Sequence, residues 1–218
     1  MSVKTKAKSM LLPDPGPRPI AAGLARGVRM HIDFTTQTQL YLGLYEIELT
    51  RFLRSVLRPG ARVFDVGVQH GYDSLLFANQ TRAPVAGFEC DGTSVARARE
   101  NVELNAPLAP LVQTILGEVG DQPGQTSLDG WAYDGGFIPD FIKLDIDGGE
   151  AGALRSARRL LSERRPALLV EVHSVELEQE CGRLLVEHGY KPVIINQRRF
   201  WREWRPIAHN RWLVAPGR

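Results

Sequence analysis

The chain has few cysteines and no long apolar stretch, and these two absences exclude several classes of protein. Cys90 and Cys181 are the only cysteines in 218 residues, and their spacing matches neither a disulfide framework nor a zinc motif. No apolar run reaches the ~18 residues that a membrane-spanning helix needs. The apolar residues 10–12 are followed at once by Pro13, which leaves no room for a signal peptide core. We therefore expect a cytoplasmic protein with no membrane span.

The composition is that of a globular protein, with 43% hydrophobic and 24% charged residues. The net charge of +2 is small but unevenly distributed. Residues 1–30 carry +5, residues 191–218 carry +6, and the stretch between them carries −9. The basic ends either attract an anionic partner or are simply solvated.

The first 58 residues differ in pattern from the rest. Four prolines at alternate positions between Pro13 and Pro19 favour an extended chain, so we expect residues 1–20 to form a mobile arm outside the core. Apolar residues alternate with polar ones over 28–34, which predicts a half-buried strand, and the spacing over 40–57 predicts a helix. We therefore divide the chain into an N-terminal arm, strand and helix at 1–58, acting as a cap, and one α/β domain at 59–218.

Strands and helices alternate in the remainder of the chain. Expected strands are 63–66, 84–88, 111–116, 141–144, 167–172, 193–195 and 212–215, and expected helices are 71–79, 93–105, 150–161 and 175–188. The passage 117–139 is rich in Gly, Asp and Pro and predicts an irregular excursion. This alternation indicates an α/β fold with a mostly parallel sheet, helices on both faces, and an antiparallel pair at the end.

The first of these strands ends in a turn that suits a ligand. Asp65, Gly67 and Gly71 form a D-x-G-x-x-x-G pattern, and Gln69 stands where a dinucleotide motif has its second glycine. Such turns bind ligands beyond the carboxyl ends of the strands. Glu89 ends the next strand, where a carboxylate can accept hydrogen bonds from two ribose hydroxyls. The glycine turn and Glu89 together therefore indicate a nucleoside ligand.

A second group of polar residues ends two later strands. Asp145 follows the strand 141–144, while Glu171 and His173 share one face at the end of the strand 167–172. If the two strands are neighbours, these three side chains converge. They then act as a histidine base with carboxylates that orient it, or as ligands of a divalent cation such as Mg²⁺. The third alternative is that they cap loops and pair with arginines.

Several motifs together resemble one family, the FkbM-type S-adenosylmethionine-dependent O-methyltransferases of the class I methyltransferase superfamily. The motifs are Gly43-Leu44-Tyr45-Glu46, Val63-Phe64-Asp65-Val66-Gly67 with Gly71-Tyr72, Ser127-Leu128-Asp129, the run from Asp140 to Glu150 that contains IKLDIDGGE, and Glu171-Val172-His173. The glycine turn is common to all class I methyltransferases. The combination of IKLDIDGGE with a later EVH is more specific.

The resemblance implies a Rossmann-like sheet of seven strands in the order 3-2-1-4-5-7-6. It also implies transfer of a methyl group to a hydroxyl of a small molecule, such as a sugar, a glycolipid or a polyketide-like natural product. The S-adenosylmethionine site would consist of Glu46, Asp65, Gly67, Gln69, Gly71, Tyr72, Glu89 and Asp145. We take His173 as the base, with Asp145 and Glu171 as orienting residues or as metal ligands.

Two other functions remain open at this stage. The basic, aromatic segment 198–205 could bind RNA or another nucleic acid, but no N-P-P-Y-like loop follows the fourth strand, so we expect no nucleic-acid partner. A methyltransferase-like binding protein without turnover is the second alternative, motivated by Gln69 and His70 in the turn. Self-association as a homodimer is compatible with the same aromatic segment and the N-terminal arm.

Overall fold

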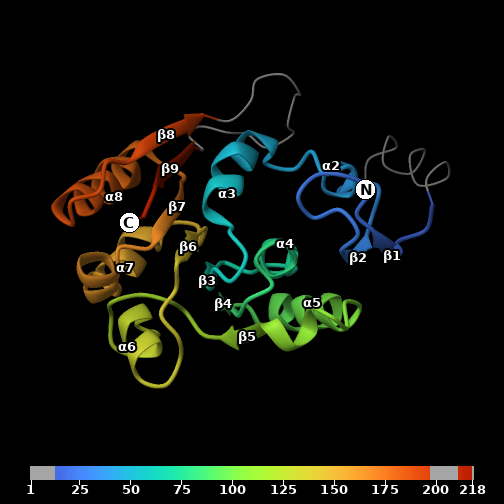
Figure 1. The fold of residues 1–218 in the computed structure, drawn as a ribbon, viewed down its shortest axis with the longest axis horizontal. Helices are drawn as coiled ribbons and strands as arrows, with labels where there is room; N and C mark the ends of the chain where they lie inside the picture. Colours follow the sequence, from blue (N-terminus) through green and yellow to red (C-terminus); the bar gives the residue numbers. More distant parts are fainter. Residues whose placement is uncertain (1–12, 197–210, 218) are drawn as a thin grey trace.

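A seven-stranded sheet forms the middle of the protein, whose computed structural model describes residues 13–196 and 211–217. The strand order is β5-β4-β3-β6-β7-β9-β8 (Figure 1). The strands are β3 (Val63–Val66), β4 (Val85–Glu89), β5 (Val112–Leu116), β6 (Phe141–Leu144), β7 (Ala167–Val172), β8 (Val193–Asn196) and β9 (Arg211–Ala215). Strands β3 to β7 are parallel, and β9 runs antiparallel to both β7 and β8. The predicted α/β fold and strand order are therefore confirmed.

Helices cover both faces of this sheet (Figure 1). They are α2 (Thr38–Tyr41), α3 (Thr50–Val56), α4 (Tyr72–Thr81), α5 (Gly92–Glu103), α6 (Leu128–Tyr133), α7 (Glu150–Arg155) and α8 (Val175–Glu187), with 3-10 turns at Ile47–Leu49 and Ala109–Leu111 and a π-helical turn at Leu160–Arg164. None of the helices in the described ranges has the length and apolar character needed to cross a bilayer.

Alternate strand residues pack into two separate cores. Phe64 and Val66 of β3 pack with α6, α7 and α8, whereas Val63 packs with α3, α4 and the N-terminal segment. In the same way, Ile142 and Phe141 of β6 face opposite cores. Successive side chains of a strand point to opposite faces, so a sheet that is buried on both faces has one core on each side. Only strand-end side chains on the same face can therefore meet.

The N-terminal segment is part of the folded protein from residue 16 onward. Strand β1 (Gly16–Pro19) pairs antiparallel with β2 (Arg29–Ile32), and the following Ile20 is 1% exposed. Pro17 and Pro19 lie on the outer strand of this hairpin, where a missing N–H is tolerated. The expectation that residues up to 20 lie outside the core is therefore wrong for Ile20, and residues 16–19 form a paired strand rather than a mobile arm, while residues 1–12 fall outside the described part. The division of the chain at residue 58 stays a prediction.

The single helix expected over 40–57 is broken in two places. Gly43 has a φ of +66°, and a Cβ there would lie 2.1 Å from the carbonyl oxygen of Ala22, so two backbone segments cross at this point. Glu46 has a φ of +45°, which is also left-handed. The apolar spacing does not separate buried from exposed residues here, since Leu44 is 40% exposed whereas Leu49, Leu53 and Leu57 are buried. It also contains no signal for the two breaks, of which the one at Gly43 depends on contacts with residues 22 and 23.

The passage 117–139 contains one short helix, α6, that the sequence did not predict. Ser127 caps this helix, because its hydroxyl accepts a hydrogen bond from the N–H of Gly130 at 3.2 Å. The carboxylate of Asp129 accepts bonds from the N–H groups of Arg159 (2.7 Å) and Leu160 (2.9 Å). The motif Ser127-Leu128-Asp129 therefore fixes α6 to the π-helical turn and has a structural role.

Candidate active site

Three charged residues occupy core-facing positions in neighbouring strands. Asp65 of β3 stands in register with Lys143 of β6, and Lys143 with Leu169 of β7, two residues before Glu171. Asp65, Lys143 and Glu171 are 0%, 2% and 3% exposed, respectively. They share the face that packs against α4, and they lie toward the carboxyl ends of the strands, where α/β sheets bind their ligands.

Lys143 is the cation of a buried charge network. Its Nζ donates to Oδ2 of Asp73 at 2.7 Å and to Oδ2 of Asp145 at 3.0 Å. Burial lowers the pKa of Lys143, but Asp145 and Asp73 outweigh this effect and raise it well above its usual range. Burial acts against the ionisation of Asp145, yet Lys143 brings the pKa of this carboxyl below its usual range. Lys143 thus keeps Asp145 ionised at the end of β6.

The turn after β3 has left-handed backbone at three positions. Gly67 has a φ of +93°, and a Cβ there would lie 1.8 Å from the carbonyl oxygen of Asp145. Gly71 has a φ of +82°, and its Cβ would lie 3.3 Å from the Cα of Ala98 in α5. Gln69, between them, has a φ of +49°. The two glycines thus allow the turn to fit between the end of β6 and α5.

Glu89 ends β4 beside this turn, and two backbone amides hold its carboxylate. The N–H of Gln69 donates to Oε2 at 2.9 Å, and the N–H of Asp91 donates to Oε1 at 3.0 Å. Each carboxylate oxygen retains a further lone pair. The side chain is partly exposed, so it can accept two hydrogen bonds from a ligand.

Asp65 lies beneath the turn rather than at its surface. The hydroxyl of Ser74 donates a short hydrogen bond to Oδ2, and the buried Oδ1 has no hydrogen-bond partner. Burial raises the pKa of Asp65 to about 7. Asp65, which the resemblance places in the cofactor site, thus has no exposed surface.

The structure also brings together Glu46 and Tyr72, which are distant in sequence. With Tyr45 and Asp73, they line a small cavity of about 20 Å³, enough for about one water molecule. The rings of Tyr45 and Tyr72 meet edge to face, with centroids 5.8 Å apart. Burial raises the pKa of Glu46 well above its usual range, against the attraction of Lys143. These predicted cofactor residues thus lie next to the Lys143 network.

Asp145, Glu171 and His173 converge, as the sequence predicts if β6 and β7 are neighbours. The two strands are paired, and one potential ligand atom from each of the three residues lies within 4.8 Å of the others. Two carboxylates and one imidazole at this spacing are a possible donor set for a divalent cation.

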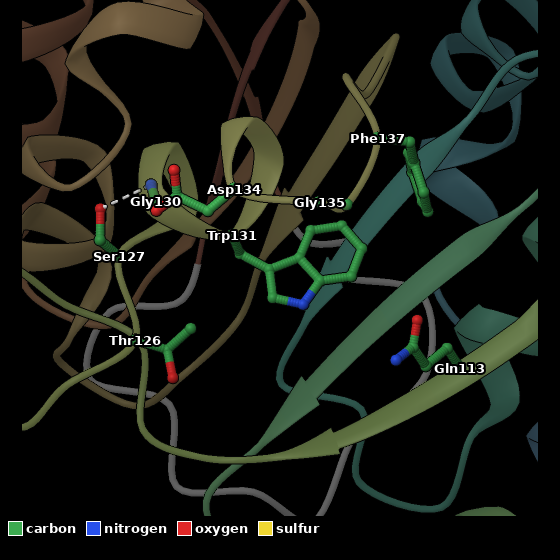
Figure 2. A pocket seen from close by; sticks show the side chains of 9 residues that line it. Gln113, Thr126, Ser127, Gly130, Trp131, Asp134, Gly135 and Phe137 are labelled. Carbon is green, nitrogen blue, oxygen red and sulfur yellow. Dashed lines mark hydrogen bonds between the residues drawn. The ribbon is translucent and has the colours of Figure 1, made fainter.

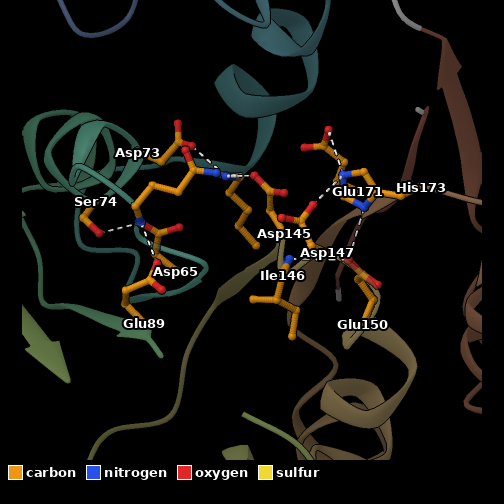
Figure 3. Close-up of polar contacts among 12 residues, drawn as sticks. Asp65, Asp73, Ser74, Glu89, Asp145, Ile146, Asp147, Glu150, Glu171 and His173 are labelled. Carbon is orange, nitrogen blue, oxygen red and sulfur yellow. Dashed lines mark hydrogen bonds and ion pairs between the residues drawn. The ribbon is translucent and has the colours of Figure 1, made fainter. Parts of the chain in front are cut away.

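His173 is surrounded by carboxylates on several sides (Figure 3). Its Nδ1 lies 3.5 Å from Oε1 of Glu150, and its Nε2 lies 3.6 Å from Oε1 of Glu171 and 3.6 Å from Oδ1 of Asp147. Glu150 and then Glu171 raise the pKa of His173 to about 10, although burial opposes them. At neutral pH the imidazole is therefore a cation, and it cannot accept a proton until one is removed.

Lys143, Asp73 and Glu150 also belong to the site, although the sequence motifs did not predict a role for them. Glu150 is fully buried, and its carboxylate accepts hydrogen bonds from the N–H of Gly148 at 3.1 and 3.2 Å. A lysine within the apolar strand Phe141–Leu144 was a usable signal, because a charge at a buried strand position needs partners. The partner Asp73 has no such signal in the sequence.

A hollow of about 590 Å³ lies elsewhere, under α6. Figure 2 shows the indole of Trp131 beside this hollow, with Phe137, Thr126 and Gln113 around it. Trp131 packs with Phe64 in the core on the α6 side of the sheet. The residues of the charge network face α4, so this hollow is not part of the site described above.

A comparison with known protein families identifies one match, the FkbM domain of methyltransferases, over residues 113–207. The match covers 95 of the 218 residues, in the second half of the chain. The matched range includes IKLDIDGGE and Glu171-Val172-His173, the motifs on which the resemblance mainly depends. The matched range begins after the glycine turn and Glu89, so the family match does not include these two features. No curated protein matches the chain.

Solved methyltransferases share the fold of this chain at low sequence identity. A methyltransferase FkbM from Methylobacillus flagellatus KT is 19% identical with a TM-score of 0.60, and the match covers 85% of this chain but only 56% of the other. A precorrin-6y C5,15-methyltransferase from Geobacter metallireducens GS-15 is 14% identical with a TM-score of 0.55, covering 80% and 88%. Aeropyrum pernix fibrillarin, solved with natively bound S-adenosyl-L-methionine, is 15% identical with a TM-score of 0.55, covering 73% and 68%. The fold is thus that of S-adenosylmethionine-binding methyltransferases.

Proposed function

We propose that the protein transfers a methyl group from S-adenosylmethionine to a hydroxyl oxygen of a small molecule, such as a sugar, a glycolipid or a polyketide-like natural product. The observation that carries this proposal is the convergence of Asp145, Glu171 and His173 beside the glycine turn, within 4.8 Å of one another. A hydroxyl is a poor nucleophile, so a cluster that removes or polarises its proton is the feature that its methylation requires.

The residues around the turn fit the cofactor. Glu89 has lone pairs for two ribose hydroxyls, and the backbone of Gly67, Gln69 and Gly71 would line the amino-acid end. Glu46, Tyr72 and Asp145 would complete that end, next to Asp73, and Asp65 would support the turn from beneath. The excess of carboxylates over the cations Lys143 and His173 favours a ligand that carries positive charge. When bound, the cofactor supplies an activated sulfonium methyl group.

His173 has two roles open to it, and its protonation decides between them. In the arrangement described here it is an imidazolium, which can orient the acceptor oxygen by donating a hydrogen bond, and it becomes the base for the hydroxyl proton only after it loses its own proton. A divalent cation such as Mg²⁺, held by Asp145, Glu171 and His173, would supply Lewis acidity that lowers the pKa of the hydroxyl. Since a metal ligand must be unprotonated, binding of the ion requires His173 to lose its proton.

The test is a transfer assay with S-adenosylmethionine labelled in the methyl group, using hydroxyl compounds and the corresponding amines. We expect a labelled ether, and we expect His173→Gln to lower the rate by about 10²–10⁴-fold. Because the raised pKa of about 10 leaves little neutral His173 at pH 7, the rate without metal should increase as the pH rises toward 10. Added Mg²⁺ should shift this increase to lower pH.

The matched control for this assay is His188→Gln. His188 follows α8, and its Nδ1 contacts the hydroxyl of Ser162 at 2.9 Å, away from the cluster. Its replacement should leave the rate unchanged. Label found only on nitrogen or carbon, or equal rates for His173→Gln and the unmodified chain, would refute the proposed acceptor chemistry.

A further inference from the structure

Two asparagines hold the N-terminal hairpin to the α/β domain. Asn105 exchanges two hydrogen bonds with the backbone of Arg29, from its N–H at 2.8 Å and to its carbonyl at 2.7 Å. One helical turn earlier, Oδ1 of Asn101 accepts a bond from the N–H of His31 at 2.8 Å. Residues four apart share a helix face, and residues two apart share a strand face. The two amides therefore pair with β2 much as a neighbouring strand would.

Asn101 makes a second bond that Asn105 does not make. Its Nδ2 donates to the carbonyl oxygen of His70, in the glycine turn, at 2.9 Å. Asn101 is 3% exposed, and its amide orientation is fixed because the N–H of His31 can only donate and the carbonyl of His70 can only accept. One buried side chain thus joins the hairpin to the turn.

The position of the His70 carbonyl matters for Glu89. The preceding residue, Gln69, is left-handed with a φ of +49°, a conformation that a residue with a side chain adopts only when its neighbours hold it there. Its N–H donates to Oε2 of Glu89 at 2.9 Å. The His70 carbonyl belongs to the peptide between residues 70 and 71, two peptides after the one that carries the Gln69 N–H, so an anchor there limits the conformations of the whole turn and through it the direction of this N–H.

We propose that Asn101 is a positioning residue for the cofactor site. It holds the glycine turn in the shape that orients Glu89, and it makes the N-terminal hairpin part of the same cooperative unit. The inference rests on the proposed function, because it assumes that Glu89 and the turn bind the cofactor. Helix α5 and strand β2 contribute no predicted ligand contact, yet through Asn101 they affect the affinity for the cofactor.

Substitutions of Asn101 and Asn105 separate a positioning role of Asn101 from a general effect on the stability of the hairpin. Asn101→Asp keeps an oxygen for the N–H of His31 but replaces the donor to His70 by a second acceptor. Asn105→Ala removes the bonds to the N–H and carbonyl of Arg29 and to the carbonyl of Asn101, so it should loosen the hairpin without touching the turn. Asn101→Ala is the second test variant, because it introduces no charge.

The measurement is calorimetric titration of the full chain with S-adenosylhomocysteine, below the unfolding temperature of every variant. We expect the Kd to rise about tenfold for Asn101→Asp and Asn101→Ala, which is the effect of losing about one buried hydrogen bond, and to stay within about twofold for Asn105→Ala. Without ligand, hydrogen exchange of the Gln69 amide should accelerate in the Asn101 variants alone.

The results of this titration separate a failure of the positioning role of Asn101 from a failure of the proposed function. An unchanged Kd in both Asn101 variants would overturn the positioning role. Equal weakening in the Asn101 and Asn105 variants would also overturn it, because the effect would then follow from the loosened hairpin alone. If the unmodified chain fails to bind S-adenosylhomocysteine, the proposed function itself is wrong and the inference fails with it.

Discussion

Glu89→Ala should lower the affinity for S-adenosylhomocysteine by about 10²–10⁴-fold. A carboxylate that accepts two hydrogen bonds from ribose hydroxyls contributes about 1.5–3 kcal/mol for each bond. The substitution also leaves the N–H groups of Gln69 and Asp91 without their partner, so the turn loses one of its links to β4 and keeps the bond from the N–H of Gly67 to the carbonyl of Phe88. Calorimetric titration of the variant and the unmodified chain measures the change directly.

Two further variants complete this experiment. Glu103→Ala removes an exposed carboxylate from α5 and should leave the affinity unchanged. Glu89→Gln keeps one oxygen acceptor but not the charge, so its affinity should fall between those of Glu89→Ala and the unmodified chain. A Glu89→Ala variant that binds within about twofold of the unmodified chain would show that the ribose assignment is wrong.

Lys143→Met should lower the free energy of unfolding by about 3–5 kcal/mol, the usual cost of removing one partner from a buried ion pair. Methionine fills a similar volume, but it leaves the carboxylates of Asp73 and Asp145 buried without their cation. Their side chains are only 14% and 9% exposed, so water cannot fully replace the lost charge. Urea unfolding, monitored by circular dichroism, measures the difference.

An exposed ion pair provides the control for this variant. Arg62 lies 3.7 Å from Asp140, and the two side chains are 41% and 54% exposed, so Arg62→Met should cost less than about 1 kcal/mol. Adding Asp73→Asn to Lys143→Met should recover part of the loss, because one unpaired charge is removed. Equal costs for Lys143→Met and Arg62→Met would contradict the buried network.

The sheet could be predicted from the sequence because its signals are local. Strands such as Val63–Val66 and Phe141–Leu144 are short apolar runs between turn residues, and helices of ordinary length separate them. A right-handed crossover then leaves few possible arrangements. The resemblance to FkbM methyltransferases supplied the strand order, which local patterns alone do not determine.

The parts of the fold that could not be predicted depend on long-range contacts. The break at Gly43 exists because the backbone at Ala22 crosses it, and periodicity within 40–57 contains no record of that crossing. Strand β1 forms because its partner β2 is fixed from the other side by Asn101 and Asn105. The basic segment 198–205 lies outside the described residues, so its predicted roles stay untested.

The candidate site shows the same division between local and long-range information. Strand ends alone pointed to Asp145, Glu171 and His173, because parallel strands bring their carboxyl ends to one edge. The protonation of His173 could not be predicted, since its raised pKa depends on Glu150, the first residue of α7. Lys143 was similarly missed because its partner Asp73 belongs to α4, 70 residues away.

Calorimetric titration of the unmodified chain with S-adenosylhomocysteine is the most direct test of the cofactor site. It should be repeated with added Mg²⁺ and after chelation, which tests the cluster of Asp145, Glu171 and His173 in the same experiment. We expect saturable binding of one ligand per chain. No binding at millimolar ligand would contradict the assignment of Glu89 and the glycine turn, and would favour a methyltransferase-like protein without turnover.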